Sequence, residues 1–189
     1  QVYKYSIVSS AGGCAAVNAT TSVTITAPST ATISYAGSPY CSSINTAQPV
    51  SLSGTGSYTG GSYSASPSTL TINSATGTIT PSSSTPGTYT VTYTRAGTGG
   101  CGNVVATATV VISQAPFATI TYGNVNICPN SGNRTVSLIG TNGGQYTSTA
   151  GLNINPTNGT INTNSSTPGT YTVTYSIAAA NGCSAFSTT

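Results

Sequence analysis

Apolar and polar side chains alternate with a period of two along most of this chain. The clearest stretch is Thr85–Tyr93, where Tyr89, Val91 and Tyr93 alternate with threonines. Such alternation is typical of a β-strand with one buried face and one solvated face, so we expect these three side chains to point inward and the threonines outward. No stretch has the period of a helix, and the chain is therefore predicted to be all-β.

The same nine residues, Thr-Pro-Gly-Thr-Tyr-Thr-Val-Thr-Tyr, recur unchanged at Thr167–Tyr175, an offset of 167 − 85 = 82 positions. Other segments recur in the same order: Ala31–Tyr35 resembles Ala118–Tyr122, and Gly77–Ile79 matches Gly159–Ile161. A chain with this self-similarity is predicted to be a tandem array of one structural unit.

Aligning the copies sets a domain frame. Val23–Ile25 aligns with Val110–Ile112, near the end of a repeat, so the chain is expected to begin and to stop inside a domain. We predict residues 1–27 to be the last two strands of a preceding repeat, 28–114 to be a complete repeat, and 115–189 to be a repeat that lacks most of its last strand.

Each repeat of about 85 residues is expected to hold roughly seven short strands separated by Gly, Pro and Asn turns. That pattern is typical of an immunoglobulin-like β-sandwich. In the complete repeat the expected strands are 31–36, 48–54, 61–65, 69–73, 77–80, 87–95 and 103–113.

Composition removes most catalytic chemistry. The chain has no Asp, Glu or His and only three Lys and Arg, so 2% of its residues are charged, against about 25% in ordinary soluble domains. Acid–base catalysis relies mostly on the missing residues, and metal sites need carboxylates, His or clustered Cys. We therefore expect no enzyme, no catalytic residue, no cofactor and no metal.

The net charge of +3 is spread over Lys4, Arg95 and Arg134. Nucleic-acid and anionic-membrane surfaces need clustered basic residues, so we expect neither partner. No apolar run reaches the roughly 18 residues of a membrane span, and no membrane insertion is expected.

Five cysteines occupy two kinds of position in the repeats. Cys41 and Cys128 follow the first strand of their units, while Cys14, Cys101 and Cys183 lie in the turn before the last strand. Pairing within units predicts one intradomain disulfide in each, Cys41 with Cys101 and Cys128 with Cys183. Structural disulfides place the protein outside the cytoplasm, in an extracellular setting, at a cell surface or in a filament.

Cys14 has no partner in this scheme. Its partner would lie in the missing part of its own repeat or, if the chain is a complete subunit, in a neighbouring subunit. The incomplete ends would then invite donor-strand exchange between subunits. Against simple donation, the amino-terminal fragment repeats a strand that the last unit already owns, and a window from a continuous array explains that duplicate more directly.

Four asparagines fit the acceptor pattern for N-glycosylation: Asn18, Asn133, Asn158 and Asn164. A neutral β-rich chain risks edge-to-edge aggregation, because surface charge is the usual protection. Attached glycans or tight packing into a filament would supply that protection.

The repeated nine-residue string, a following Gly-Gly-Cys or Asn-Gly-Cys and a Thr/Val strand ending in Ala-Pro resemble the tandem immunoglobulin-like or PKD-like repeats of giant surface adhesins in Bacteroidetes-type bacteria, including gliding-motility adhesins. The resemblance covers essentially the whole chain. It implies a stalk without catalytic residues. The absence of acidic residues departs from many relatives and argues against calcium-stiffened linkers.

Three functions remain open from the sequence. The leading one is a structural segment of an extracellular bacterial fibre or long adhesin, whose partners are neighbouring repeats or identical subunits. The others are a module that binds glycans or another surface, and a filament subunit polymerised by donor-strand exchange. Aromatic residues gathered at one exposed site would favour binding, and aromatic residues buried in every copy would favour the stalk.

Overall fold

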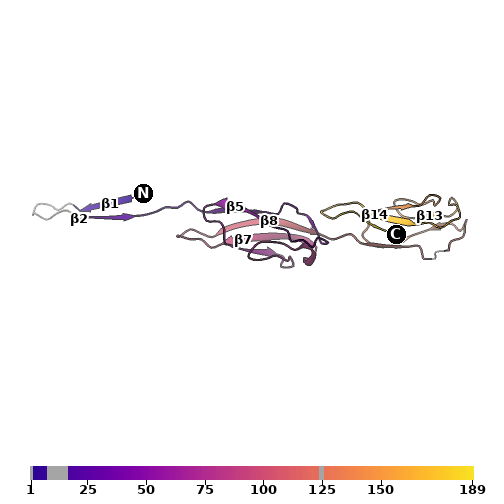
Figure 1. Cartoon of the computed structure of the whole chain (residues 1–189), viewed down its shortest axis with the longest axis horizontal. Coiled ribbons are helices and arrows are strands. Elements are labelled where there is room, and N and C mark those ends of the chain that lie inside the picture. Colours follow the sequence, from indigo (N-terminus) through magenta and orange to yellow (C-terminus); the bar gives the residue numbers. More distant parts are fainter. Residues whose placement is uncertain (1, 8–16, 124–125) are drawn as a thin grey trace, which may run out of the picture.

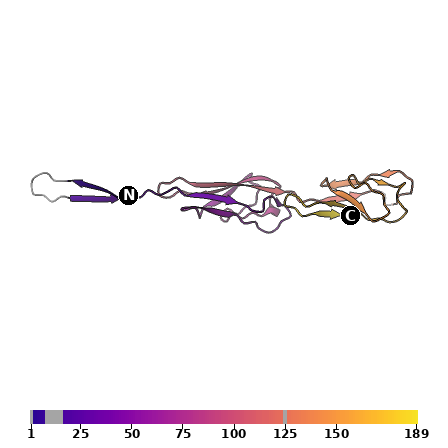
Figure 2. The same cartoon turned by 90° about the horizontal axis from the view of Figure 1, so that it is seen from above.

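The computed structural model describes residues 2–7, 17–123 and 126–189, with side chains from Thr20 onward. The chain is all-β, and within these ranges its only helical element is the short 3-10 helix η1 (Pro81–Ser83). Its parts follow one another along one long axis (Figure 1), as the perpendicular view also shows (Figure 2). An amino-terminal hairpin comes first, then a central unit that runs from β3 (Thr30–Ser34) to β8 (Val104–Ser113), and a C-terminal unit that runs from β9 (Ala118–Thr121) to β15 (Phe186–Thr188).

Two sheets form the central unit. One pairs β3 (Thr30–Ser34) with β5 (Ser51–Thr55), and the other has the order β4-β8-β7-β6. The bounds of the second sheet are Tyr40–Cys41 for β4, Val104–Ser113 for β8, Gly87–Arg95 for β7 and Ser62–Ser66 for β6. Buried side chains from both sheets form one core, which includes Ile33, Tyr93 and Val110.

The C-terminal unit has a similar arrangement, with a shorter last strand and, in the described residues, no counterpart of β4. Its β9 (Ala118–Thr121) pairs with β11 (Ser137–Gly140), and β12 (Gln145–Ser148), β14 (Val173–Ile177) and β15 (Phe186–Thr188) form a second sheet. A further pair joins β10 (Asn133–Arg134) to β13 (Ile161–Asn162). Where β8 has ten residues, β15 has three.

The alternation expected in the long strand is confirmed in the central unit. On β7 the side chains of Tyr89, Val91 and Tyr93 are almost completely buried, while Thr90 between them is exposed. β-Branched and aromatic residues suit a pleated, half-buried surface, which is why this segment forms a strand.

The prediction of two strands in the complete repeat is wrong. Segments 69–73 and 77–80 are not strands but a short loop pair closed by an isolated bridge between Ile72 and Ile79. The sequence also gave no sign of β4, because a two-residue strand has no period to detect. β4 exists because Tyr40 and Cys41 pair in parallel with the end of β8.

Buried tyrosines tie the strands of the central unit to its loops. The Tyr35 hydroxyl donates to the carbonyl of Gly77 at 2.6 Å. The Tyr93 hydroxyl accepts from the amide of Gly61 at 2.8 Å and donates to the carbonyl of Tyr58 at 2.5 Å. Because each hydroxyl is paired, these large side chains fill the core without leaving a buried polar atom unsatisfied.

Equivalent tyrosines make the same bonds in the C-terminal unit. Tyr122 donates to the carbonyl of Gly159 at 2.6 Å, and Tyr175 accepts from the amide of Gly144 at 2.8 Å. The rings of Tyr146 and Tyr175 pack with their centroids 4.7 Å apart, as those of Tyr63 and Tyr93 do at 4.9 Å. The repeat therefore extends from the sequence to individual hydrogen bonds.

The amino-terminal hairpin pairs β1 (Val2–Ile7) with β2 (Val17–Ser22) in antiparallel register, from Val2 opposite Ser22 to Ile7 opposite Val17. Its assignment as the last two strands of a preceding repeat stays a prediction. In the part of the chain that the structure describes, no helix is long and apolar enough to cross a membrane.

Candidate functional site: the junction between the units

A disulfide joins the two units where their ends meet. Cys41 ends β4 of the central unit, and Cys183 lies in the turn before β15 of the C-terminal unit. Their Cα atoms are 4.7 Å apart, although the two residues are 142 positions apart in sequence. Because the peptide linker also connects the units, the disulfide gives the junction a second covalent connection and limits bending.

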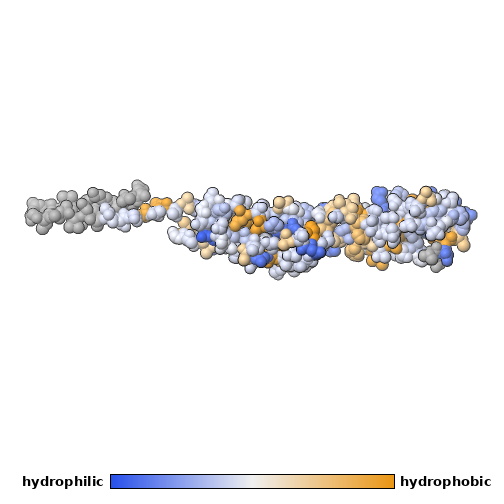
Figure 3. Space-filling model, viewed as in Figure 1, coloured by the Kyte–Doolittle hydropathy of each residue, from blue (hydrophilic) through white to orange (hydrophobic). Residues whose placement is uncertain are grey.

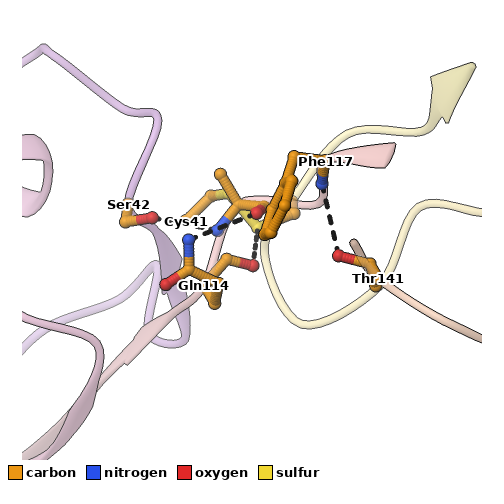
Figure 4. Close-up of a disulfide and its surroundings, with 7 residues drawn as sticks. Cys41, Ser42, Gln114, Phe117 and Thr141 are labelled. Atoms are coloured by element: carbon orange, nitrogen blue, oxygen red, sulfur yellow. Dashed lines mark hydrogen bonds between the residues drawn. A yellow bond between two sulfur atoms is a disulfide. The ribbon is translucent and has the colours of Figure 1, made fainter. Parts of the chain in front are cut away.

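Hydrogen bonds hold the linker on both sides of the disulfide (Figure 4). On the central unit, the amide of Ser42 donates to the carbonyl of Ser113 at 2.8 Å, and the amide of Ala115 donates to the Ser42 hydroxyl at 2.9 Å. On the C-terminal unit, the amide of Phe117 donates to the Thr141 hydroxyl at 3.2 Å, and the amide of Thr141 donates to the carbonyl of Phe117 at 2.7 Å.

The pairings expected from the sequence, Cys41 with Cys101 and Cys128 with Cys183, are wrong. Cys41 pairs in the ladder with Ser113 at the end of β8, whereas Cys101 precedes the start of β8. A strand of ten residues spans about 33 Å, and a disulfide needs Cα atoms within about 7 Å. The two cysteines of one unit therefore lie at its opposite ends, and the bond forms between units instead.

A tight turn, Ala180–Cys183, presents Cys183 to its partner. Both central residues have positive φ, 51° at Asn181 and 78° at Gly182, and the amide of Cys183 donates to the carbonyl of Ala180 at 2.9 Å. A Cβ atom on Gly182 would lie 2.0 Å from the carbonyl oxygen of Pro39 in the central unit. Only glycine therefore allows the two units to come this close.

The turn Thr98–Cys101 in the central unit has the same conformation. Gly99 and Gly100 have φ of 64° and 80°, and the amide of Cys101 donates to the carbonyl of Thr98 at 3.2 Å. A Cβ atom on Gly100 would meet nothing within 4 Å. Cys101 is partly buried and free, and its Sγ lies 3.7 Å from the Thr26 hydroxyl.

Cys128 occupies the repeat position of Cys41 but is exposed and free. The end of β8, which pairs with Cys41 in the central unit, has no counterpart beside Cys128 in the described residues. Cys14, expected to be unpaired or bonded between units, lies outside the described residues.

A groove of about 690 Å³ opens next to Cys128 in the C-terminal unit. Apolar side chains in its walls include Ile120, Tyr122, Leu152, Ile161 and Val173, and threonines line much of the rest. The sequence did not predict this groove, and the structure places it beside the free thiol of Cys128.

Three of the expected glycan acceptors, Asn133, Asn158 and Asn164, are exposed. The Asn158 side-chain oxygen accepts from the amide of Thr160 at 3.0 Å, so that asparagine also orders its own turn. Asn18 lies in β2, and its side chain is outside the described part of the chain. Glycosylation at the four positions stays a prediction.

Burial raises the pKa of two tyrosines that anchor the loops. For Tyr122, burial and then the nearby Tyr146 raise the pKa to about 12. The pKa of Tyr35 is also raised, by burial first and then by Tyr63 and Tyr40. In both cases the ionised phenolate would lose water contacts that the fold does not replace.

We expect the thermal unfolding midpoint to be nearly flat from about pH 5 to pH 7.5, because the chain has no Asp, Glu or His. Above about pH 10 the midpoint should fall, because unfolded tyrosines ionise there while Tyr122 in the fold stays neutral until about pH 12. The stability from the raised pKa is thus full below pH 10 and is lost as the pH rises. Unfolding followed by circular dichroism should give a smaller alkaline loss for Tyr122→Phe. An equal loss in both proteins, or a steep loss below pH 5, would contradict this.

Among the residues that the structure describes, no group of three or more His, Cys, Asp or Glu could hold a metal ion. Compared with protein-family models and with curated proteins, the chain matches none.

Proposed function

We propose that this chain is a structural segment of an extracellular bacterial fibre or long surface adhesin built from tandem immunoglobulin-like repeats. The observation that carries the proposal is the Cys41–Cys183 disulfide, which couples the end of one unit to the start of the next. A junction closed by both a linker and a disulfide transmits force and orientation along a rod. A stalk needs this property, whereas an isolated binding domain does not.

Tyrosines at the start of the long strand favour the immunoglobulin-like assignment. In that fold a tyrosine near the start of one strand bonds back to the backbone a few residues upstream. Here the Tyr89 hydroxyl donates to the carbonyl of Thr85, and the Tyr171 hydroxyl donates to the carbonyl of Thr167 at 2.5 Å. The same corner in two units supports two copies of one sandwich.

The disulfide also supports an extracellular location, because such bonds persist in oxidising compartments and are rare in the cytosol. A non-catalytic role fits the sequence, since the usual proton-transfer residues are missing.

The placement of the aromatic residues favours a stalk over a glycan-binding module. Tyr63, Tyr89 and Tyr93 are buried in the central unit, as Tyr146 and Tyr175 are in the C-terminal unit. A sugar-binding surface would instead need these rings exposed and gathered. Large exposed apolar side chains in the described part are aliphatic except for Phe117, which lies at the junction.

Antibodies raised against the folded chain test the proposal on intact, unpermeabilised cells of the source organism. Immunogold electron microscopy should place label along threads or surface projections outside the envelope. Label confined to the cell interior would contradict an extracellular fibre, and permeabilised cells provide the control for antibody access.

A further inference from the structure

We propose that Cys101 and Cys128 are the two halves of a head-to-tail joint between copies of this chain. Segment 23–26 of one copy fills the groove in the C-terminal unit of another, and Cys101 of the first copy bonds Cys128 of the second. The joint rests on the proposed function, because it is a contact that extends the row of units into a fibre. The Cys41–Cys183 junction within the chain is the structural model for this joint.

The groove has the shape left by the end of β8. In the central unit, Val110 and Ile112 near that end are 0% and 2% exposed, so they are core residues. In the C-terminal unit β15 stops at Thr188, and the side chains of Ile120 and Val173 are only partly buried. The corresponding Ile33 and Val91 of the central unit are 4% and 0% exposed. An extended segment with apolar side chains at alternate positions therefore fits this groove.

Such a segment lies exposed at the other end of the same molecule. Val23 and Ile25 occupy the repeat positions of Val110 and Ile112, yet they are 47% and 84% exposed. They follow β2 without belonging to a strand, and the space-filling view shows apolar residues on this stretch (Figure 3). In the groove of a second copy, the side chains of Val23 and Ile25 would be removed from water and would pack against apolar side chains.

The cysteines fit the same contact. In the intrachain junction, Cys41 lies beside Ser113, and the Sγ of Cys183 lies 3.5 Å from the carbonyl oxygen of the next residue, Gln114. Thr26 occupies the repeat position of Ser113, and its hydroxyl already lies 3.7 Å from the Sγ of Cys101. A copy that places Thr26 beside Cys128 of another copy therefore also brings Cys101 to that thiol.

The turn that presents Cys101 is already formed for this partner. At the junction within the chain, Gly182 approaches the carbonyl of Pro39. Gly100 has the equivalent place in the turn Thr98–Cys101, and the space beside it is open. Asn126 is at the repeat position of Pro39 and precedes Cys128 by two residues. In the joint, the backbone of Asn126 takes the open place beside Gly100.

The amino-terminal hairpin must leave the groove free. Residues 17–20 align with residues 186–189 in the repeat. The receiving copy already has its own residues 186–189 at that place in the sheet, so residues 17–20 of the other copy cannot occupy it. Only the segment after β2 enters, and the hairpin of β1 and β2 stays outside the groove. This removes the objection that a donated strand would duplicate one that the unit owns.

Bond formation is a two-electron oxidation. The thiols of Cys101 and Cys128 lose two protons and two electrons, and one S–S bond forms. The oxidant is a small-molecule disulfide, whose own S–S bond is reduced to two thiols by thiol–disulfide exchange.

The test is the chain of residues 1–189, folded in a glutathione redox buffer and separated by non-reducing electrophoresis. A ladder that disappears under reduction is expected, and peptide mapping by mass spectrometry should find Cys101 linked to Cys128. Cys101→Ser and Cys128→Ser should each abolish the ladder, and mixing the two variants should give dimers and nothing longer. A Cys14→Ser chain should still form the ladder. A ladder lost with Cys14→Ser, or monomers throughout, would overturn the joint.

Two further variants separate the joint from folding, each with a matched control. Gly100→Asn should lower the cross-linked fraction at least about tenfold, because the added Cβ meets the partner's backbone, whereas Gly99→Asn should not, because Asn181 already occupies that place in the other turn. Ile25→Asp should do the same by placing a charge in the apolar groove, and Val105→Asp, at another exposed apolar position, should have no effect. Ladders unchanged in Gly100→Asn and Ile25→Asp would contradict the geometry.

Failure here can be told from failure of the proposed function. Threads labelled outside cells, with an intact Cys41–Cys183 bond but no Cys101–Cys128 peptide, would support the stalk function and contradict the joint. The absence of external label would remove the stalk, whatever the electrophoresis shows.

Discussion

Cys183→Ala is expected to lower the free energy of unfolding of the two linked units by about 5 kcal/mol. The bond closes a loop between residues 142 positions apart, and the chain-entropy relation gives about that value for such a loop. For a chain of this size the loss corresponds to a fall of roughly 10–20 °C in the thermal midpoint. Alanine is chosen because Cys183 is buried and a serine would add an unpaired hydroxyl there.

Circular dichroism melting checks this in a chain whose other cysteines, Cys14, Cys101 and Cys128, are serines, so that it stays monomeric. Dithiothreitol added to that parent chain should reproduce the Cys183→Ala midpoint. Small-angle X-ray scattering should also show a broader range of maximum dimensions for the variant, because the units are then joined by the linker alone. A midpoint and a scattering profile identical to those of the parent would contradict a structural junction.

Tyr93→Ala should unfold the central unit or bring it close to unfolding. Its side chain is 1% exposed, its ring packs against Tyr63 at 4.9 Å, and its hydroxyl joins the amide of Gly61 to the carbonyl of Tyr58. Truncating a buried aromatic side chain costs about 3–5 kcal/mol, while whole domains have only about 5–15 kcal/mol. The variant also leaves two backbone groups without a partner.

Urea unfolding measures this loss, and two variants on the same strand bracket it. Tyr93→Phe removes the hydroxyl alone and should cost about 1–3 kcal/mol. Thr90→Ala, on the exposed face, should stay within about 0.5 kcal/mol of the parent. If Tyr93→Ala were as mild as Thr90→Ala, the tyrosine would not be holding the core together.

The candidate site was predictable in its parts but not in its arrangement. The repeat alignment correctly placed Cys101 and Cys183 in the turn before the last strand and Cys41 after the first strand. The error was to assume that the cysteines of one repeat meet. The two kinds of cysteine lie at opposite ends of β8, about 33 Å apart, and this separation arises from the pairing of Cys41 with Ser113, which the sequence did not indicate.

The sequence by itself determined the all-β class, the inward and outward faces of β7, and the near-absence of catalytic side chains. These depend on local spacing and composition, which a chain carries in one dimension. Only the tertiary structure decided that Cys41 bonds Cys183, that β4 pairs with the end of β8, and that a groove stands open beside Cys128. Each depends on how the end of one unit meets the next, and that distance has no counterpart in the order of residues.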